Sequence, residues 1–202
     1  RPRHRGLERR HRGRGGRQPW GGRPRLGHGQ LHPRALGAPG AGKSTLAAGL
    51  FAEMKKHYIS VELVTEYAKD LVYDGQHSND FDQLSVFAEQ HRRIARLNGK
   101  VEWVVTDSPL YLSAYYAQKS KYPEAFGMFV RLMANNYTNL NFIVQRTHKY
   151  DASGRSQNES EANEIHNELV SFMKLWHIPF EFIAAGDTQP QALFNKLFKD
   201  IV

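Results

Sequence analysis

Residues 37–45 combine the residue types that bind a nucleoside triphosphate. The spacing G-x-x-x-x-G-K-[ST] is met by Gly37, Gly42, Lys43 and Ser44. Glycines let backbone amides turn inward around phosphate oxygens, the lysine reaches the outer phosphates, and the hydroxyl is a magnesium ligand. We therefore predict a phosphate-binding loop for ATP, with Lys43 also catalytic, whose nucleotide-binding residues are Gly37, Ala38, Pro39, Gly40, Ala41, Gly42, Lys43, Ser44 and Thr45.

The stretch that follows this loop has the pattern of an amphipathic helix. Residues 43–56, KSTLAAGLFAEMKK, place Leu46, Leu50, Phe51 and Met54 on one face. The positive end of such a helix points at the bound phosphates. This context favours a nucleotide site over the alternative interpretation, a glycine-rich turn without a ligand.

Two acids directly follow apolar stretches that have the pattern of strands. Asp107 comes after VEWVVT, where phosphate-binding-loop proteins place an acid for magnesium, so we predict a magnesium site made by Ser44 and Asp107. The alternative role for Asp107 is a helix cap before Ser108 and Pro109. Glu66 follows VELVT and is predicted to be a catalytic base or substrate clamp. Its alternative is a solvated glutamate in the first turn of a helix.

Further polar residues are candidates for the lid and for the acceptor. Arg146 ends the stretch LNFIVQR and Arg155 closes the polar loop RTHKYDASGR; both are predicted to be catalytic, because arginines on a mobile loop can close over a transferred phosphoryl group. Their alternative is ordinary surface charge. Gln83, Gln90 and Arg93 either face an acceptor pocket or form the polar face of a helix. The aromatic residues of LYLSAYYAQKSKYPEAF either stack on a base or pack in the core.

Helical and strand patterns alternate along the chain after the loop. Strands are predicted at residues 59–65, 101–105, 140–145 and 179–185, and helices at 43–56, 80–99, 123–137, 156–176 and 189–202. Ser156 and Glu159 have the spacing of a capping box for the fourth helix. This alternation predicts an α/β fold of three layers with a parallel sheet, whose ligands lie at the carboxyl ends of the strands.

Charge is distributed unevenly between the start of the chain and the rest. Residues 1–35 hold 11 Arg and one Glu, a balance of +10, whereas the other 167 residues hold 17 Lys and Arg against 19 Asp and Glu, a balance of −2. We predict two parts: an Arg/Gly/Pro-rich leader at 1–35, disordered or of non-native sequence, and a kinase-like domain at 36–202. The alternative for the leader is a genuine basic arm that binds nucleic acid.

Several functional classes are excluded by what the sequence lacks. The chain has no cysteine, which excludes disulfides, thiolate metal sites and cysteine nucleophiles. Its ten histidines show no paired spacing on a helix face, so we predict no metal site made from them. No apolar run approaches the roughly 18 residues of a membrane span, so no membrane partner is expected.

The motifs GAPGAGKST, VTEYAKDLV, VVTDSPL and QRTHKYDASGRSQNESEANEI occur in this order. They resemble those of small phosphate-binding-loop kinases grouped with the nicotinamide riboside kinase domain of bacterial NAD-regulator proteins, and most of all those of ATPase or kinase proteins of tailed bacteriophages with an AAA domain. The resemblance covers residues 36 to about 187. It implies a nucleoside- and nucleotide-kinase-like fold, ATP with Mg²⁺, and a short lid that carries Arg155.

The same resemblance bears on the catalytic acid, on the first strand and on location. Deoxynucleoside kinases place a catalytic acid at the end of the second strand, which supports Glu66. The family has an apolar first strand where this chain has GQLHPRAL, with Pro33 inside it, so the strand that holds the loop is expected to be degraded. A cytoplasmic location is expected, in a bacterial host if the chain is phage-encoded.

Three classes of function are compatible with these motifs. A kinase transfers the outer phosphoryl group to a hydroxyl, a motor NTPase transfers it to water, and a binding module does neither. Motor proteins commonly place a glutamate beside the second-motif aspartate, where this chain has Ser108. We therefore predict a kinase acting on a nucleoside-like small molecule, such as a nucleoside or nicotinamide riboside. The alternative acceptor is DNA, at a hydroxymethylated base or a 5′ end, although the domain lacks the basic balance that phosphate contacts require.

Overall fold

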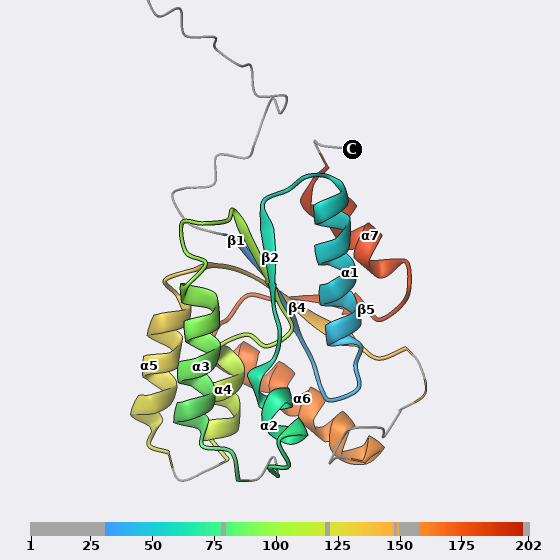
Figure 1. The fold of residues 1–202 in the computed structure, drawn as a ribbon. Helices are drawn as coiled ribbons and strands as arrows, with labels where there is room; N and C mark the ends of the chain where they lie inside the picture. The colour runs from blue at the N-terminus through green and yellow to red at the C-terminus, as the bar shows by residue number, and fades with distance from the viewer. Residues whose placement is uncertain (1–30, 78–79, 120–121, 148, 150–157, 200–202) are drawn as a thin grey trace, which may run out of the picture.

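A five-stranded parallel sheet forms the centre of the fold in the computed structural model. The structure describes residues 31–77, 80–119, 122–147, 149 and 158–199. The strand order is β2-β3-β1-β4-β5, so the first strand is central. Figure 1 shows the sheet between its helices. The strands are β1 (Leu31–Leu36), β2 (Val61–Val64), β3 (Trp103–Thr106), β4 (Thr138–Gln145) and β5 (Glu181–Ala184).

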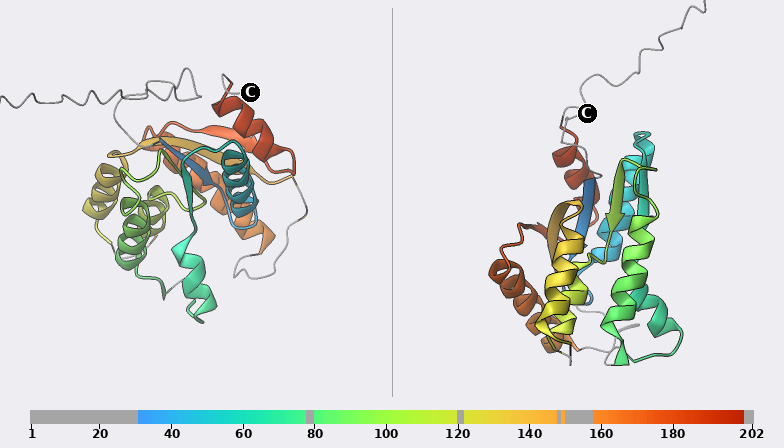
Figure 2. Two further views of the ribbon diagram at one scale, coloured as in Figure 1. Left: turned by 45° about the horizontal axis from the view of Figure 1, so that its top comes forward. Right: turned by 90° about the vertical axis from the view of Figure 1, so that its left-hand side faces the viewer.

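Helices cover both faces of the sheet, which confirms the predicted three-layer α/β architecture. Figure 2 shows α1 and α7 on one face. These two helices pack with the sheet in one apolar cluster, whereas α3, α4, α5 and α6 share a second cluster on the other face. The described helices are α1 (Lys43–Lys56), α2 (Tyr67–Tyr73), α3 (Gln83–Ala95), α4 (Tyr111–Ala117), α5 (Glu124–Ala134), α6 (Glu159–Leu175) and α7 (Gln189–Leu197). Within the described ranges no helix is long and apolar enough to cross a membrane.

The predicted helix after the loop coincides with α1, because its apolar face meets the sheet. Leu46, Leu50 and Met54 are buried there as expected. The predicted capping box of α6 was wrong by two residues. Asn158 is the N-cap: its side chain accepts a hydrogen bond from the Glu161 amide, and the Glu161 carboxylate accepts one from the Asn158 amide.

The strand β1 begins inside the segment that we assigned to the leader. Its residues 31–35 run in register with β4, from Leu31 opposite Thr138 to Ala35 opposite Phe142. Pro33 lies within this strand although it has no amide to donate to a neighbour. The strand that we expected to be degraded does form. Pairing with β3 and β4 on its two sides outweighs the poor strand propensity of its residues.

Two side chains of β1, His32 and Arg34, fit the core poorly, whereas Ala35 and Leu36 are buried in the apolar clusters. His32 and Arg34 are 0% exposed, and none of their ring or guanidinium nitrogens has a hydrogen-bond partner. The Arg34 guanidinium lies 5.8 Å from the ring centre of Tyr111 and 5.9 Å from that of Tyr137. On the face of the sheet that α1 covers, a small cavity of about 10 Å³ lies between Pro33 of β1 and α1 residues such as Leu46 and Leu50. Burying unpaired polar groups destabilises a fold.

Burial changes the ionisation of these two side chains. It lowers the pKa of His32 to about 3, with a further contribution from the positive charge of Arg34. It lowers the pKa of Arg34 to about 10, against the opposing effect of the two tyrosines. At neutral pH His32 is therefore neutral, whereas Arg34 carries a charge that no hydrogen bond compensates.

Candidate active site

The phosphate-binding loop connects β1 to α1 at the carboxyl edge of the sheet. Gly37 has a φ of 146°, and a Cβ atom there would lie 3.0 Å from the Val144 carbonyl oxygen, so only glycine fits. Gly42 has a φ of 91° and is the N-cap of α1. The Lys43 ammonium donates to the Ala38 carbonyl at 3.1 Å, across the loop. Loop, lysine and helix N-terminus are thus arranged as a phosphate site requires.

The predicted magnesium ligands lie side by side. The Ser44 hydroxyl donates to Asp107 Oδ2 at 2.6 Å, which joins the start of α1 to the end of β3. Asp107 is 3% exposed, and its Oδ1 is a buried atom without a hydrogen-bond partner. One carboxylate and one hydroxyl suit Mg²⁺, which takes its other ligands from phosphate and water. Among the described residues, no group of three or more His, Asp or Glu side chains could hold a metal ion.

Glu66 lies between β2 and α2, at the same end of the sheet as the loop (Figure 1). It is the N-cap of α2, yet its side chain makes no capping hydrogen bond. Burial raises the pKa of its carboxyl; Lys43 opposes this shift and Asp107 adds to it. Lys43 and Asp107 are thus among the charged side chains that act on this carboxyl. Val64 of β2 lies opposite Thr106 of β3, so Glu66 and Asp107 follow neighbouring strands at the same edge of the sheet. The residue is half-buried rather than solvated, which favours a site role over the alternative.

Sequence reasoning gave no role to Lys69 and treated Tyr116 only as one of several aromatic residues. The Lys69 ammonium donates to the Ser44 hydroxyl at 3.4 Å and influences the Glu66 carboxyl. Tyr116 of α4 is half-buried, and its pKa is raised by burial and then by the charge of Glu66. The spacing of three residues between Glu66 and Lys69 was a usable signal, because such residues share a helix face. The aromatic pattern of residues 110–126 included Tyr116 but did not set it apart from its neighbours, because its place depends on how α4 packs.

The contacts that the structure describes for the predicted lid arginines do not reach the phosphate-binding loop. Arg146 directly follows β4, and its guanidinium donates to Glu159 at 3.1 Å and Asn163 at 2.7 Å, both on α6. Arg155 lies outside the described residues. Catalytic roles for both arginines therefore stay predictions.

The aromatic residues of α4 pack in or against the core, which is one of the two uses predicted for them. Tyr111 and Tyr115 are buried in the apolar cluster, as core packing requires. The Tyr115 hydroxyl donates to Glu168 at 2.6 Å, which satisfies its polar end. Tyr116 is half-buried and packs against the same cluster, and stacking of an aromatic residue on a base stays a prediction.

Asp107→Asn tests the magnesium site. The amide keeps the shape and an acceptor for Ser44 but removes the charge that attracts the cation. We expect half-maximal ATP turnover to require more Mg²⁺, and turnover at fixed Mg²⁺ to fall roughly tenfold or more for any acceptor. Magnesium titration of ADP release measures both effects. Asp82→Asn is the matched control, because Asp82 is exposed and asparagine caps α3 equally well; equal magnesium curves for Asp107→Asn and wild type would contradict the assignment.

Comparisons with known proteins agree with this geometry. A family model described as an AAA domain matches residues 35–190. Among solved structures, a crystal structure of the NadR protein in complex with NR is similar, with a TM-score of 0.61 and 16% sequence identity. The alignment covers 85% of this chain and 52% of that one, so this chain spans about half the length of the NadR chain. No curated protein matches the sequence.

Proposed function

Because this chain belongs to the AAA domain family, we propose that it is a magnesium-dependent kinase, which transfers the γ-phosphoryl group of ATP to a hydroxyl of a nucleoside-like small molecule. The observation that carries the proposal is the register of β2 and β3: Val64 lies opposite Thr106, so Glu66 leaves the sheet at the edge where Asp107 meets Ser44 of the loop helix. A nucleotide-binding module needs the loop and the magnesium ligands alone. A half-buried carboxyl beside them is what a phosphoryl acceptor requires.

In the proposed reaction each side chain has a distinct task. The Glu66 carboxylate takes the proton of the acceptor hydroxyl, whose oxygen bonds to the γ-phosphorus while the bond to the bridging oxygen breaks and ADP leaves. Lys43 offsets the negative charge that shifts toward the leaving oxygen. Ser44 and Asp107 would hold Mg²⁺, which supplies further positive charge to the phosphates when it is bound.

Two observations support a small acceptor over DNA. The similar NadR structure contains NR, so a protein of this fold binds a small molecule. Residues 36–202 carry a charge balance of −2, which does not suit contacts with a DNA backbone. We propose a nucleoside or nicotinamide riboside as the acceptor, and a cytoplasmic, phage-related kinase as the biological setting.

The experiment measures ADP release with nucleosides, nicotinamide riboside, hydroxymethylated DNA and 5′-hydroxyl DNA as separate acceptors. We expect one small nucleoside to stimulate ADP release and to gain a phosphate, detected by mass spectrometry. The control is Lys43→Ala, which should lose both ATP affinity and stimulated turnover while remaining folded by circular dichroism. ADP release that no acceptor stimulates would overturn the kinase assignment and support a hydrolase, whereas stimulation by DNA alone would replace the acceptor.

A further inference from the structure

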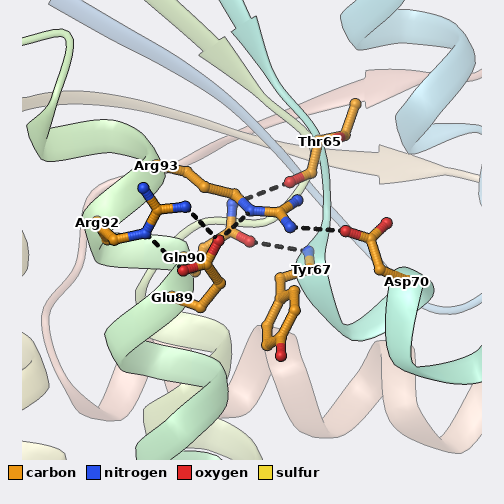
Figure 3. Close-up of polar contacts among 7 residues, drawn as sticks. All are labelled: Thr65, Tyr67, Asp70, Glu89, Gln90, Arg92 and Arg93. Atoms are coloured by element: carbon orange, nitrogen blue, oxygen red, sulfur yellow. Dashed lines mark hydrogen bonds and ion pairs between the residues drawn. The ribbon is translucent and has the colours of Figure 1, made fainter. Parts of the chain in front are cut away.

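The side chain of Gln90 on α3 forms hydrogen bonds with the backbone on both sides of Glu66. Its side-chain carbonyl accepts a hydrogen bond from the Tyr67 amide at 2.9 Å, and its side-chain NH₂ donates to the Thr65 carbonyl at 3.3 Å. Figure 3 shows the Gln90 side chain reaching from α3 to this turn. The two bonds hold the residue immediately before Glu66 and the residue immediately after it.

The burial of Gln90 makes these hydrogen bonds important. The residue is 2% exposed, so water does not replace a lost partner easily. Its carbonyl and its NH₂ group are both engaged by the backbone, which accounts for its burial better than either an acceptor-pocket contact or a polar helix face.

Arg93, one turn further along α3 than Gln90, joins α3 to α2. Its guanidinium donates to Asp70 of α2 at 2.7 Å and to Glu89 at 2.9 Å. The guanidinium carbon also lies 4.9 Å from the ring centre of Tyr67. Figure 3 shows these contacts beside those of Gln90. The segment that carries Glu66 is therefore held to α3 by a buried amide and by a half-buried ion pair.

We propose that Gln90 is a positioning residue for phosphoryl transfer, which aims the Glu66 carboxyl at the acceptor hydroxyl by fixing the backbone on both sides of it. The inference rests on the proposed function, because it assumes that Glu66 acts on an acceptor. The N-cap backbone of Glu66 is extended, with φ −66° and ψ 118°, and its side chain makes no capping bond. The Glu66 side chain therefore does not fix the turn through a capping bond, and the two hydrogen bonds of Gln90 restrain the turn instead.

The test is Gln90→Met, which keeps the length of the side chain and removes both hydrogen bonds. We expect turnover to fall roughly ten- to hundredfold, because a small misplacement of a catalytic group has effects of this size. ATP affinity, measured by calorimetry, should be unchanged, since the hydrogen bonds of Gln90 go to Thr65 and Tyr67 and not to the phosphate-binding loop. Gln90→Glu keeps an acceptor for the Tyr67 amide and should show a smaller loss, so it carries the test if Gln90→Met does not fold.

A double-mutant cycle separates positioning from general damage. In the Glu66→Gln background, Gln90→Met should cause little further loss, because a residue that acts through Glu66 has nothing left to position. Arg92→Ala is the matched control on α3. Within the described part of the chain the Arg92 guanidinium donates to Glu89, at 2.7 and 2.8 Å, and not to the turn that carries Glu66, so turnover should not change.

Three outcomes would overturn the inference. Wild-type turnover in folded Gln90→Met would show that positioning is not needed. A loss that multiplies with that of Glu66→Gln would indicate a structural effect independent of the base. If Glu66→Gln leaves turnover unchanged, the assignment of Glu66 as the base fails, and this inference fails with it. If Glu66→Gln lowers turnover but Gln90→Met does not, only the inference about Gln90 fails.

Discussion

Glu66→Gln is expected to lower acceptor-dependent turnover by roughly a hundredfold or more, while ATP affinity stays near that of the wild type. Glutamine has the shape of glutamate but cannot take the proton of the acceptor hydroxyl at neutral pH. ATP affinity is retained because the loop bonds and the Ser44–Asp107 pair do not involve Glu66. Steady-state ADP release with the acceptor, together with calorimetry for ATP, measures the two quantities separately.

The pH dependence of the wild type provides a second readout of Glu66. Burial, followed in size by the opposing effect of Lys43, leaves the pKa of its carboxyl above the ordinary value of 4.5. A base must be deprotonated to act, so kcat/KM should decline as the pH falls through this raised pKa, and the decline should begin above pH 4.5. Glu66→Gln should lack this acidic limb.

Glu62→Gln is the matched control for the base. Glu62 is a half-exposed glutamate of the neighbouring strand β2, where it pairs with Lys55 at 3.2 Å. Its replacement should leave turnover and the pH profile unchanged, because exposed ion pairs contribute little. Equal activity of Glu66→Gln and Glu62→Gln would contradict the role of Glu66 and leave the nucleotide site as the remaining assignment.

The double substitution His32→Val and Arg34→Ile is expected to stabilise the fold by several kcal/mol. Each buried Val or Ile contributes roughly 1.5–3 kcal/mol when it is fully buried. Removing Arg34 also removes a buried charge without a hydrogen-bond partner. β-Branched residues suit a central parallel strand that is covered on both faces. Urea unfolding measures the change in the free energy of unfolding.

His32 adds a pH signature to this prediction. Its folded pKa of about 3 lies below the ordinary histidine pKa of 6.5, so the unfolded state binds a proton that the folded state excludes. The free energy of unfolding should therefore fall as the pH drops from 6.5 toward 3, by up to about 1.4 kcal/mol per pH unit. The difference between wild type and His32→Val should show this slope, because groups common to both proteins cancel.

His77→Val is the control for the substitution of β1. His77 is exposed, so its replacement should change neither the stability nor the difference in pH slope. A double variant of β1 that is less stable than the wild type would contradict the prediction and would mean that His32 and Arg34 fit the core. The predicted mismatch supports our proposal that the Arg/Gly/Pro-rich segment up to residue 35 is not native to the domain.

The phosphate-binding loop and the architecture could be read from the sequence because their signals are local or periodic. Glycine, lysine and serine at fixed spacing depend on backbone geometry within one turn, and α1 followed from apolar residues at helical spacing. Alternation of strands and helices was enough for the parallel sheet. The same rule placed Asp107 and Glu66 at one edge, since parallel strands end together.

Other features were decided by contacts between residues far apart in the chain. Residues 31–35 form a strand because β3 and β4 pair with it on both sides, although their composition argued against one. Gln90 had the ordinary pattern of a polar helical residue, and only the packing of α3 against the turn after β2 buries it beside Glu66. Pairing partners and burial are properties of the assembled fold, so no local pattern could have revealed them.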